Sequence, residues 1–103
     1  MLKLTFYVPL SHKEEVKNAL FAVGAGKIGN YDSCSFEVIG NGQFRALPGA
    51  NPSIGNIGIL EIVSEARVEM VLNDHILYRV LETLKAVHPY ETPAYDVVKC
   101  LEV

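Results

Sequence analysis

The sequence lacks a long apolar run, a cluster of basic residues and a C-x-x-C motif. No stretch approaches the roughly 18 apolar residues of a membrane-spanning helix, so we expect no membrane partner. A net charge of −3 without a basic patch argues against nucleic acid as a partner. Residues 1–8 alternate like a strand and do not follow the layout of a signal peptide, which favours a cytoplasmic location.

Cysteine is also scarce. Cys34 and Cys100 lie far apart in the sequence, and we expect two reduced, half-buried thiols rather than a disulfide. Half of the 103 residues are hydrophobic, so the chain can form one core without covalent cross-links. The length therefore predicts a single domain over residues 1–103.

Alternating apolar residues predict strands over residues 2–8, 33–39, 59–72 and 95–103. In the second of these, the pattern predicts that Cys34, Phe36 and Val38 point inward. Between the strands, two apolar stripes of helical spacing cover residues 16–23 and 77–87.

Capping residues precede both predicted helices. Ser11 and Glu14 have the spacing of a capping box, and Asn73 or Asp74 can cap the second helix. Gly24 and Gly26 end the first helix, and glycines there suit a positive φ.

The order of elements is β-α-β, a long loop of residues 40–58, and β-α-β. This order predicts an α+β, ferredoxin-like βαββαβ sandwich with an antiparallel sheet of order 4-1-3-2 and both helices on one face. The inner faces of these elements predict a core that includes Phe6, Leu20, Phe36, Ile62, Val68, Leu81 and Leu84.

Three segments carry a family resemblance. Gly24-Ala-Gly-Lys-Ile-Gly-Asn-Tyr-Asp-Ser-Cys-Ser-Phe36, then Gly49-Ala-Asn-Pro-Ser-Ile-Gly55 with Gly58-x-Leu-Glu61, and finally His88-Pro-Tyr-Glu-x-Pro-Ala-Tyr-Asp96 follow one another in order. Together they resemble the inserted domain of Nif-three-like proteins, also called YqfO-like, and the resemblance covers nearly the whole chain.

The resemblance implies a domain similar to PII signalling proteins and CutA metal-tolerance proteins, which share the ferredoxin-like fold and commonly form trimers. The parent proteins hold a dinuclear metal centre in a flanking domain. Nothing in this sequence matches those ligands, so hydrolase or cyclohydrolase activity is not carried over. The chain looks like the insert alone.

Chain direction places residues 9–12, 40–58 and 88–93 at one end of the sheet. We therefore predict a ligand cleft there, with His88, Tyr90 and Glu91 as one wall and with His12 and Arg45 opposite. Pro89 and Pro93 restrict the wall's backbone, which lowers the cost of ordering it on binding. The alternative is structural: a rigid turn that aligns the last strand, with Tyr90 packed on a neighbour.

The glycine-rich segment 40–58 is open to two interpretations: a cradle for an anion, or a connection that packs against a neighbouring subunit. The edge strands 33–39 and 95–103 are fairly apolar, and uncovered edges favour pairing. We therefore expect a homo-oligomer, with a trimer favoured and a dimer second.

The leading functional hypothesis is a non-enzymatic, PII/CutA-like module that binds a small ligand or a protein partner through residues 40–58 and 88–93. It has no certain cofactor. The alternative is a divalent-metal-binding protein with His88, Glu91 and His12 as ligands. A third hypothesis, an accessory enzyme with Glu91 and His88 as acid and base, lacks a nucleophile and an oxyanion donor set.

Overall fold

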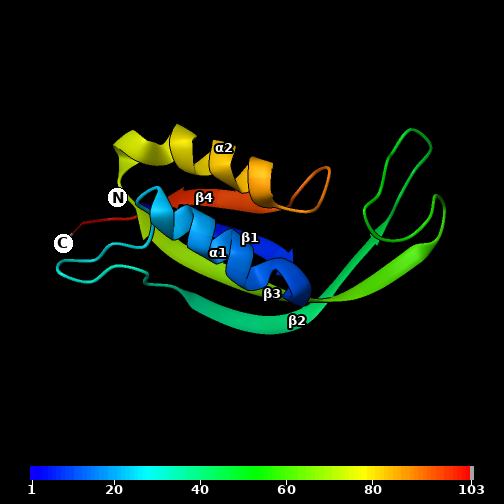
Figure 1. The fold of residues 1–103 in the computed structure, drawn as a ribbon, viewed down its shortest axis with the longest axis horizontal. Coiled ribbons are helices and arrows are strands. Elements are labelled where there is room, and N and C mark those ends of the chain that lie inside the picture. The colour runs from blue at the N-terminus through cyan, green and yellow to red at the C-terminus, as the bar shows by residue number, and fades with distance from the viewer. Residues whose placement is uncertain (103) are drawn as a thin grey trace.

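The computed structural model describes residues 1–102 and forms a two-layer α+β sandwich (Figure 1). The four-stranded antiparallel sheet has the order β2-β3-β1-β4, which confirms the predicted order 4-1-3-2. Both helices cover the same face of the sheet. The elements are β1 (Leu2–Pro9), α1 (Lys13–Ala22), β2 (Phe36–Arg45), β3 (Leu60–Leu72), α2 (Leu77–Val87) and β4 (Tyr95–Lys99), with short 3₁₀ turns at Leu10–His12 and Asp74–Ile76.

The core lies between the helices and the two central strands. Alternate residues of β1 and β3 point to the same face because side chains alternate along a strand. These residues meet the apolar stripes of α1 and α2. The fully buried side chains are Phe6, Leu4, Leu20, Leu84, Val8, Val16, Val68 and Val80. Four of the seven predicted core residues, Phe6, Leu20, Val68 and Leu84, are therefore confirmed, and Leu81 is partly buried against the same cluster.

The prediction that Ile62 is buried is wrong, because the strands are much longer than the helices. The 13 residues of β3 span about 43 Å, whereas the 11 residues of α2 span about 17 Å. The outer halves of β2 and β3 consequently project beyond the helices as an arm, defined here as residues 40–63 (Figure 1). Ile62 lies on this arm and is 64% exposed. The domain measures 46 × 24 × 24 Å as a result.

In β2, the side chains that face the helices are the ones that the sequence pattern predicted to point away from them. Glu37, not Phe36 or Val38, faces α1, where its carboxylate accepts hydrogen bonds from the ammonium groups of Lys13 (2.6 Å) and Lys17 (2.8 Å). These bonds hold the pKa of Glu37 below its usual value. Phe36, 65% exposed, points to the uncovered face of the sheet. β2 also begins later and runs further than predicted, so residues 40–45 of the expected loop are strand.

Neither predicted side-chain cap forms. A 3₁₀ turn precedes each helix, which moves the helix N-termini past the candidate caps. The Ser11 hydroxyl instead bonds Nδ1 of His12 at 2.8 Å, and Asp74 forms an ion pair with Lys99 at 3.0 Å. Gly24 and Gly26 do adopt positive φ after α1, as predicted.

The two thiols lie at opposite edges of the sheet. Cys34 precedes β2 and Cys100 follows β4, and both are free and half-buried. The last strand ends at Lys99, earlier than predicted, because residues 100–102 are not strand; residue 103 lies outside the described residues. In the described part of the chain, no helix has the length and apolar character needed to cross a membrane.

Candidate functional site

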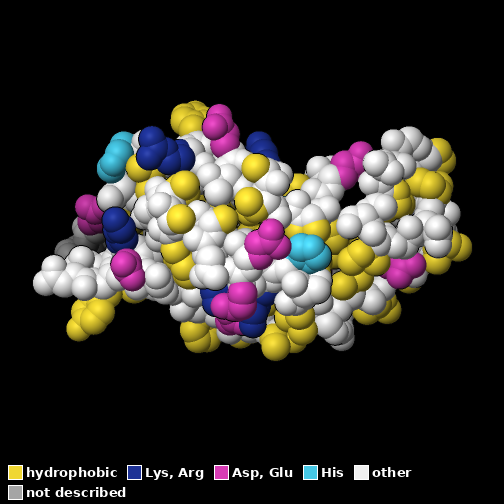
Figure 2. Space-filling model, viewed as in Figure 1, with side chains coloured by type: hydrophobic (Ala, Val, Ile, Leu, Met, Phe, Trp, Pro, Cys, Tyr) yellow, Lys and Arg dark blue, Asp and Glu magenta, His cyan; other side chains and the backbone are white. Residues whose placement is uncertain are grey.

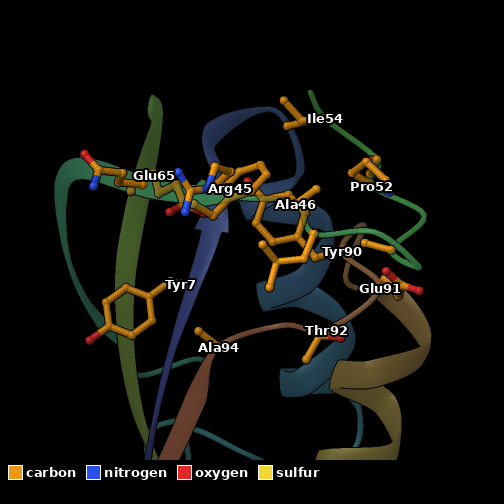
Figure 3. A pocket seen from close by; sticks show the side chains of 16 residues that line it. Tyr7, Arg45, Ala46, Pro52, Ile54, Glu65, Tyr90, Glu91, Thr92 and Ala94 are labelled. Atoms are coloured by element: carbon orange, nitrogen blue, oxygen red, sulfur yellow. The ribbon is translucent and has the colours of Figure 1, made fainter. Parts of the chain in front are cut away.

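A pocket of about 530 Å³ lies where the arm meets the loop after α2. It is bounded by β1, the arm and residues 90–94, so segments far apart in the sequence share one cavity (Figure 3). Two of the three segments predicted to gather at this end of the sheet, 40–58 and 88–93, contribute residues to the pocket. The lining residues are Tyr7, Gly42, Gln43, Phe44, Arg45, Ala46, Leu47, Ala50, Pro52, Ser53, Ile54, Glu65, Tyr90, Glu91, Thr92 and Ala94.

The tip of the arm folds back onto the loop 88–93. The backbone N–H of Asn51 donates to Oε2 of Glu91 at 3.1 Å. Within the tip, the N–H of Gly58 donates to the carbonyl oxygen of Ala46 at 2.7 Å, and Ala46 is buried. These contacts hold the tip of the arm against the loop that lines the pocket.

His88 acts as a brace rather than as a pocket wall. Its side chain is buried, and its Nε2–H donates to the carbonyl oxygen of Tyr7 at 2.7 Å. Its Nδ1 accepts the backbone N–H of Tyr90 at 3.1 Å. Since a carbonyl only accepts, these two bonds select the neutral tautomer with the proton on Nε2. Burial lowers the pKa of His88, which favours the same neutral form.

Tyr90 carries the pocket's aromatic wall. Its ring lies 5.9 Å from the ring of Phe44 and 5.1 Å from the imidazole of His88, measured between centroids. Its hydroxyl is buried beside the carboxylate of Glu65, without a well-formed hydrogen bond to any of the described residues. Burial, the negative charge of Glu65 and the approach of its carboxylate to the hydroxyl raise the pKa of Tyr90 to about 12, so the hydroxyl keeps its proton.

Glu65 is the site residue that the sequence reasoning missed. Its Oε2 is buried beside the hydroxyl of Tyr90, without a well-formed hydrogen bond to any residue in 1–102. The residue lies on β3 opposite Gly40, and its carboxylate lies over Gly42. The signal was present in the sequence, because a glycine within a strand often marks a close approach of another group. It was hidden because residues 40–45 were assigned to a loop.

The structure divides the five predicted site residues. Tyr90, Glu91 and Arg45 line the pocket, whereas His88 and His12 do not. His12 lies at the start of α1, where its Nδ1 bonds Ser11. Within residues 1–102, no three His, Cys, Asp or Glu side chains are grouped so as to hold a metal ion. A single chain thus does not assemble the set His88, Glu91 and His12.

Comparison with known sequences identifies relatives much longer than this chain. No protein-family model matches it. Proteins from Mycobacterium tuberculosis and Bacillus subtilis, each named GTP cyclohydrolase 1 type 2 homolog, are 47% and 44% identical to it over 95 residues. Each match covers 92% of this chain, but the chain spans only about a quarter of the relatives' length (25% and 26%).

Solved structures confirm both the fold and the relationship. A Bacillus cereus protein related to NIF3 superimposes with a TM-score of 0.79 at 40% identity, over 93% of this chain and 24% of that one. CutA1 from Pyrococcus horikoshii superimposes with a TM-score of 0.72 at 16% identity, over 100% of this chain and 86% of that one, which shows the shared fold alone. The chain is therefore a homologue of the CutA-like segment of Nif-three-like proteins.

Proposed function

We propose that this chain is a non-enzymatic, homo-oligomeric PII/CutA-like module that binds a small ligand through the arm and the loop 88–93. The observation that carries the proposal is the pocket between these two segments. Its walls come from three strands and a loop that the buried His88 fixes to β1, so the site exists before a ligand arrives. Preorganisation of this kind lowers the cost of binding. The alternative partner, another protein, would dock on the same loops.

The activity in the relatives' name is not part of this proposal, because the chain spans a quarter of their length. The cytoplasmic location stays a prediction from the sequence.

Exposed apolar side chains support the oligomer. Several lie on the arm and on the uncovered end of β2, including Phe36, Ile39, Leu47, Ile57, Ile59, Leu60 and Ile62. Figure 2 shows apolar side chains gathered over the arm and along the β2 side of the molecule. A surface of this kind favours burial against another molecule, and β2 and β4 are open sheet edges. We expect a trimer before a dimer.

The test combines a screen for ligand-induced melting shifts with a variant that fills the pocket. Thr92→Trp places a large side chain at the exposed rim of the cavity, and Asn18→Trp places the same side chain on the exposed face of α1 as a control. A ligand of this site raises the melting temperature of the wild type and of Asn18→Trp, but not of Thr92→Trp. Equal shifts in all three proteins would place binding elsewhere.

A second candidate is a divalent-metal-binding protein. Its support is the fold shared with the periplasmic divalent cation tolerance protein CutA from Archaeoglobus fulgidus, which is 17% identical over the whole chain. Because His88, Glu91 and His12 are not grouped within one chain, the metal would require ligands from a second subunit. Metal analysis of protein purified without an affinity tag tests this candidate.

A further inference from the structure

We propose that the pocket takes a small organic cation, an amine or guanidinium attached to an apolar body, whose N–H groups bind the carboxylate of Glu65. This inference rests on the proposed function of the pocket and adds the chemical class of its ligand.

The first argument is the buried oxygen of Glu65, which lacks a well-formed hydrogen bond within the described residues. Its Oε2 is buried beside the hydroxyl of Tyr90, which approaches the carboxylate without forming a hydrogen bond of good geometry. A buried polar group that lacks its hydrogen bond costs roughly 1–3 kcal/mol, and more for a charged group. A carboxylate can only accept, so the group that relieves this cost must be a donor.

The second argument is the space that β2 leaves for this carboxylate. A Cβ added to Gly42 would overlap Oε1 and Cδ of Glu65, so the side chain occupies room that exists because residue 42 is glycine. Gly40 lies on the same strand, directly opposite Glu65, and a Cβ added there would meet no atom within 4 Å. The position of the carboxylate thus depends on Gly42 and not on Gly40.

The third argument is the character of the walls. The rings of Tyr90 and Phe44 pack together beside the carboxylate, and Tyr7 lines the same cavity. Aromatic faces attract cations as well as apolar groups. The hydroxyl of Tyr90, next to this carboxylate, adds an oxygen that accepts a further N–H. Figure 3 labels Tyr7, Tyr90 and Glu65 among the side chains that line the pocket.

Charge selects a cation over an anion. The charged side chains that line the pocket are Arg45, Glu65 and Glu91, so carboxylates outnumber cations. Arg45 is exposed, and it forms no ion pair with either carboxylate in the described part of the chain. An organic cation also suits the site better than a metal ion, because residues 1–102 provide no group of three metal-ligating side chains.

The experiment uses three probes of the same shape and different charge: phenethylamine, phenylethanol and phenylacetate. Each is titrated into the assembled wild-type protein while the NMR signals of Glu65, Tyr90 and Phe44 are followed. We expect phenethylamine to shift these signals and to bind at least tenfold more tightly than the other two probes. Preference for phenylacetate, or no preference, overturns the choice of a cation but leaves the pocket as a ligand site.

Three variants test whether Glu65 is the group that recognises the amine. Glu65→Gln removes the charge and keeps the shape, and Gly42→Ala forces the carboxylate out of its place. Both should weaken phenethylamine binding at least tenfold, while Gly40→Ala should leave it unchanged. Undiminished binding to folded Glu65→Gln overturns the proposal. If no probe shifts the signals, the cation proposal fails; if the ligand screen also finds nothing at this pocket, the proposed function fails with it.

Discussion

The imidazole of His88 joins the loop after α2 to the central strand β1, with Nε2 donating to the carbonyl oxygen of Tyr7 at 2.7 Å. The same ring accepts the N–H of Tyr90 on Nδ1, so one buried side chain satisfies two backbone groups. The residue that the sequence suggested as a binding group therefore holds in place the residues that do line the pocket.

His88→Ala should lower the free energy of unfolding by at least about 2 kcal/mol, because it leaves the Tyr7 carbonyl and the Tyr90 N–H without partners. Urea titration followed by circular dichroism measures the change. His75→Ala is the matched control, because His75 is exposed and should change stability by less than about 0.5 kcal/mol. Equal effects of the two substitutions would show that the brace contributes nothing.

Stability should fall as the pH drops below about 6.5, the pKa of an unfolded histidine. Burial lowers the pKa of His88 in the folded protein, and the charge of His12 acts in the same direction, while the bond to Tyr7 and the charge of Glu65 oppose it. The unfolded state thus binds the proton more readily, so this contribution is complete above the unfolded pKa and is lost as the pH falls toward the folded one. Urea titrations between about pH 5.5 and 7.5 test this. His75→Ala should keep the dependence and His88→Ala should reduce it.

The fold could be predicted because the elements that form the core have unambiguous periods. Leu4, Phe6 and Val8 alternate on β1, and Val80 and Leu84 repeat on α2 with helical spacing, so both patterns point to one shared core. The same reasoning wrongly predicted that Phe36 and Ile62 are buried. Alternation indicates which residues share a face, but it does not indicate whether a second layer covers that face. Coverage depends on the length of the helices relative to the strands.

The site could be predicted only in its general position. Chain direction brings Tyr90, Glu91 and Arg45 to one end, and that follows from topology alone. The role of Glu65 depends on the register between β2 and β3, which sets its carboxylate over Gly42. Glycine is disfavoured in strands, so Gly40 and Gly42 hid the strand that creates this register. Likewise, the sequence cannot show that the carbonyl of Tyr7 lies within reach of His88.

Leu84→Ala should destabilise the domain by about 2–5 kcal/mol, because the side chain is fully buried between α2 and the sheet. Leu81→Ala, on the same helix, should cost less, because Leu81 is only partly buried against the core. Denaturant titration of both variants gives the difference directly. A larger loss for Leu81→Ala would mean that another subunit covers that side of α2.

Ile62→Glu should dissociate the proposed oligomer without unfolding the chain. Ile62 is 64% exposed on the arm, beyond the ends of the helices, so a carboxylate there meets water in the isolated subunit. In an assembly that covers the arm, the same carboxylate would be buried without a partner, at a cost of several kcal/mol. Tyr78→Glu is the control, because Tyr78 is 80% exposed on α2, away from the arm. Light scattering at micromolar concentration should give an oligomer for the wild type and Tyr78→Glu and a monomer for Ile62→Glu, with circular dichroism unchanged in all three. A monomeric wild type would remove the oligomer from the proposed function, and an oligomeric Ile62→Glu would place the subunit contact elsewhere on the sheet.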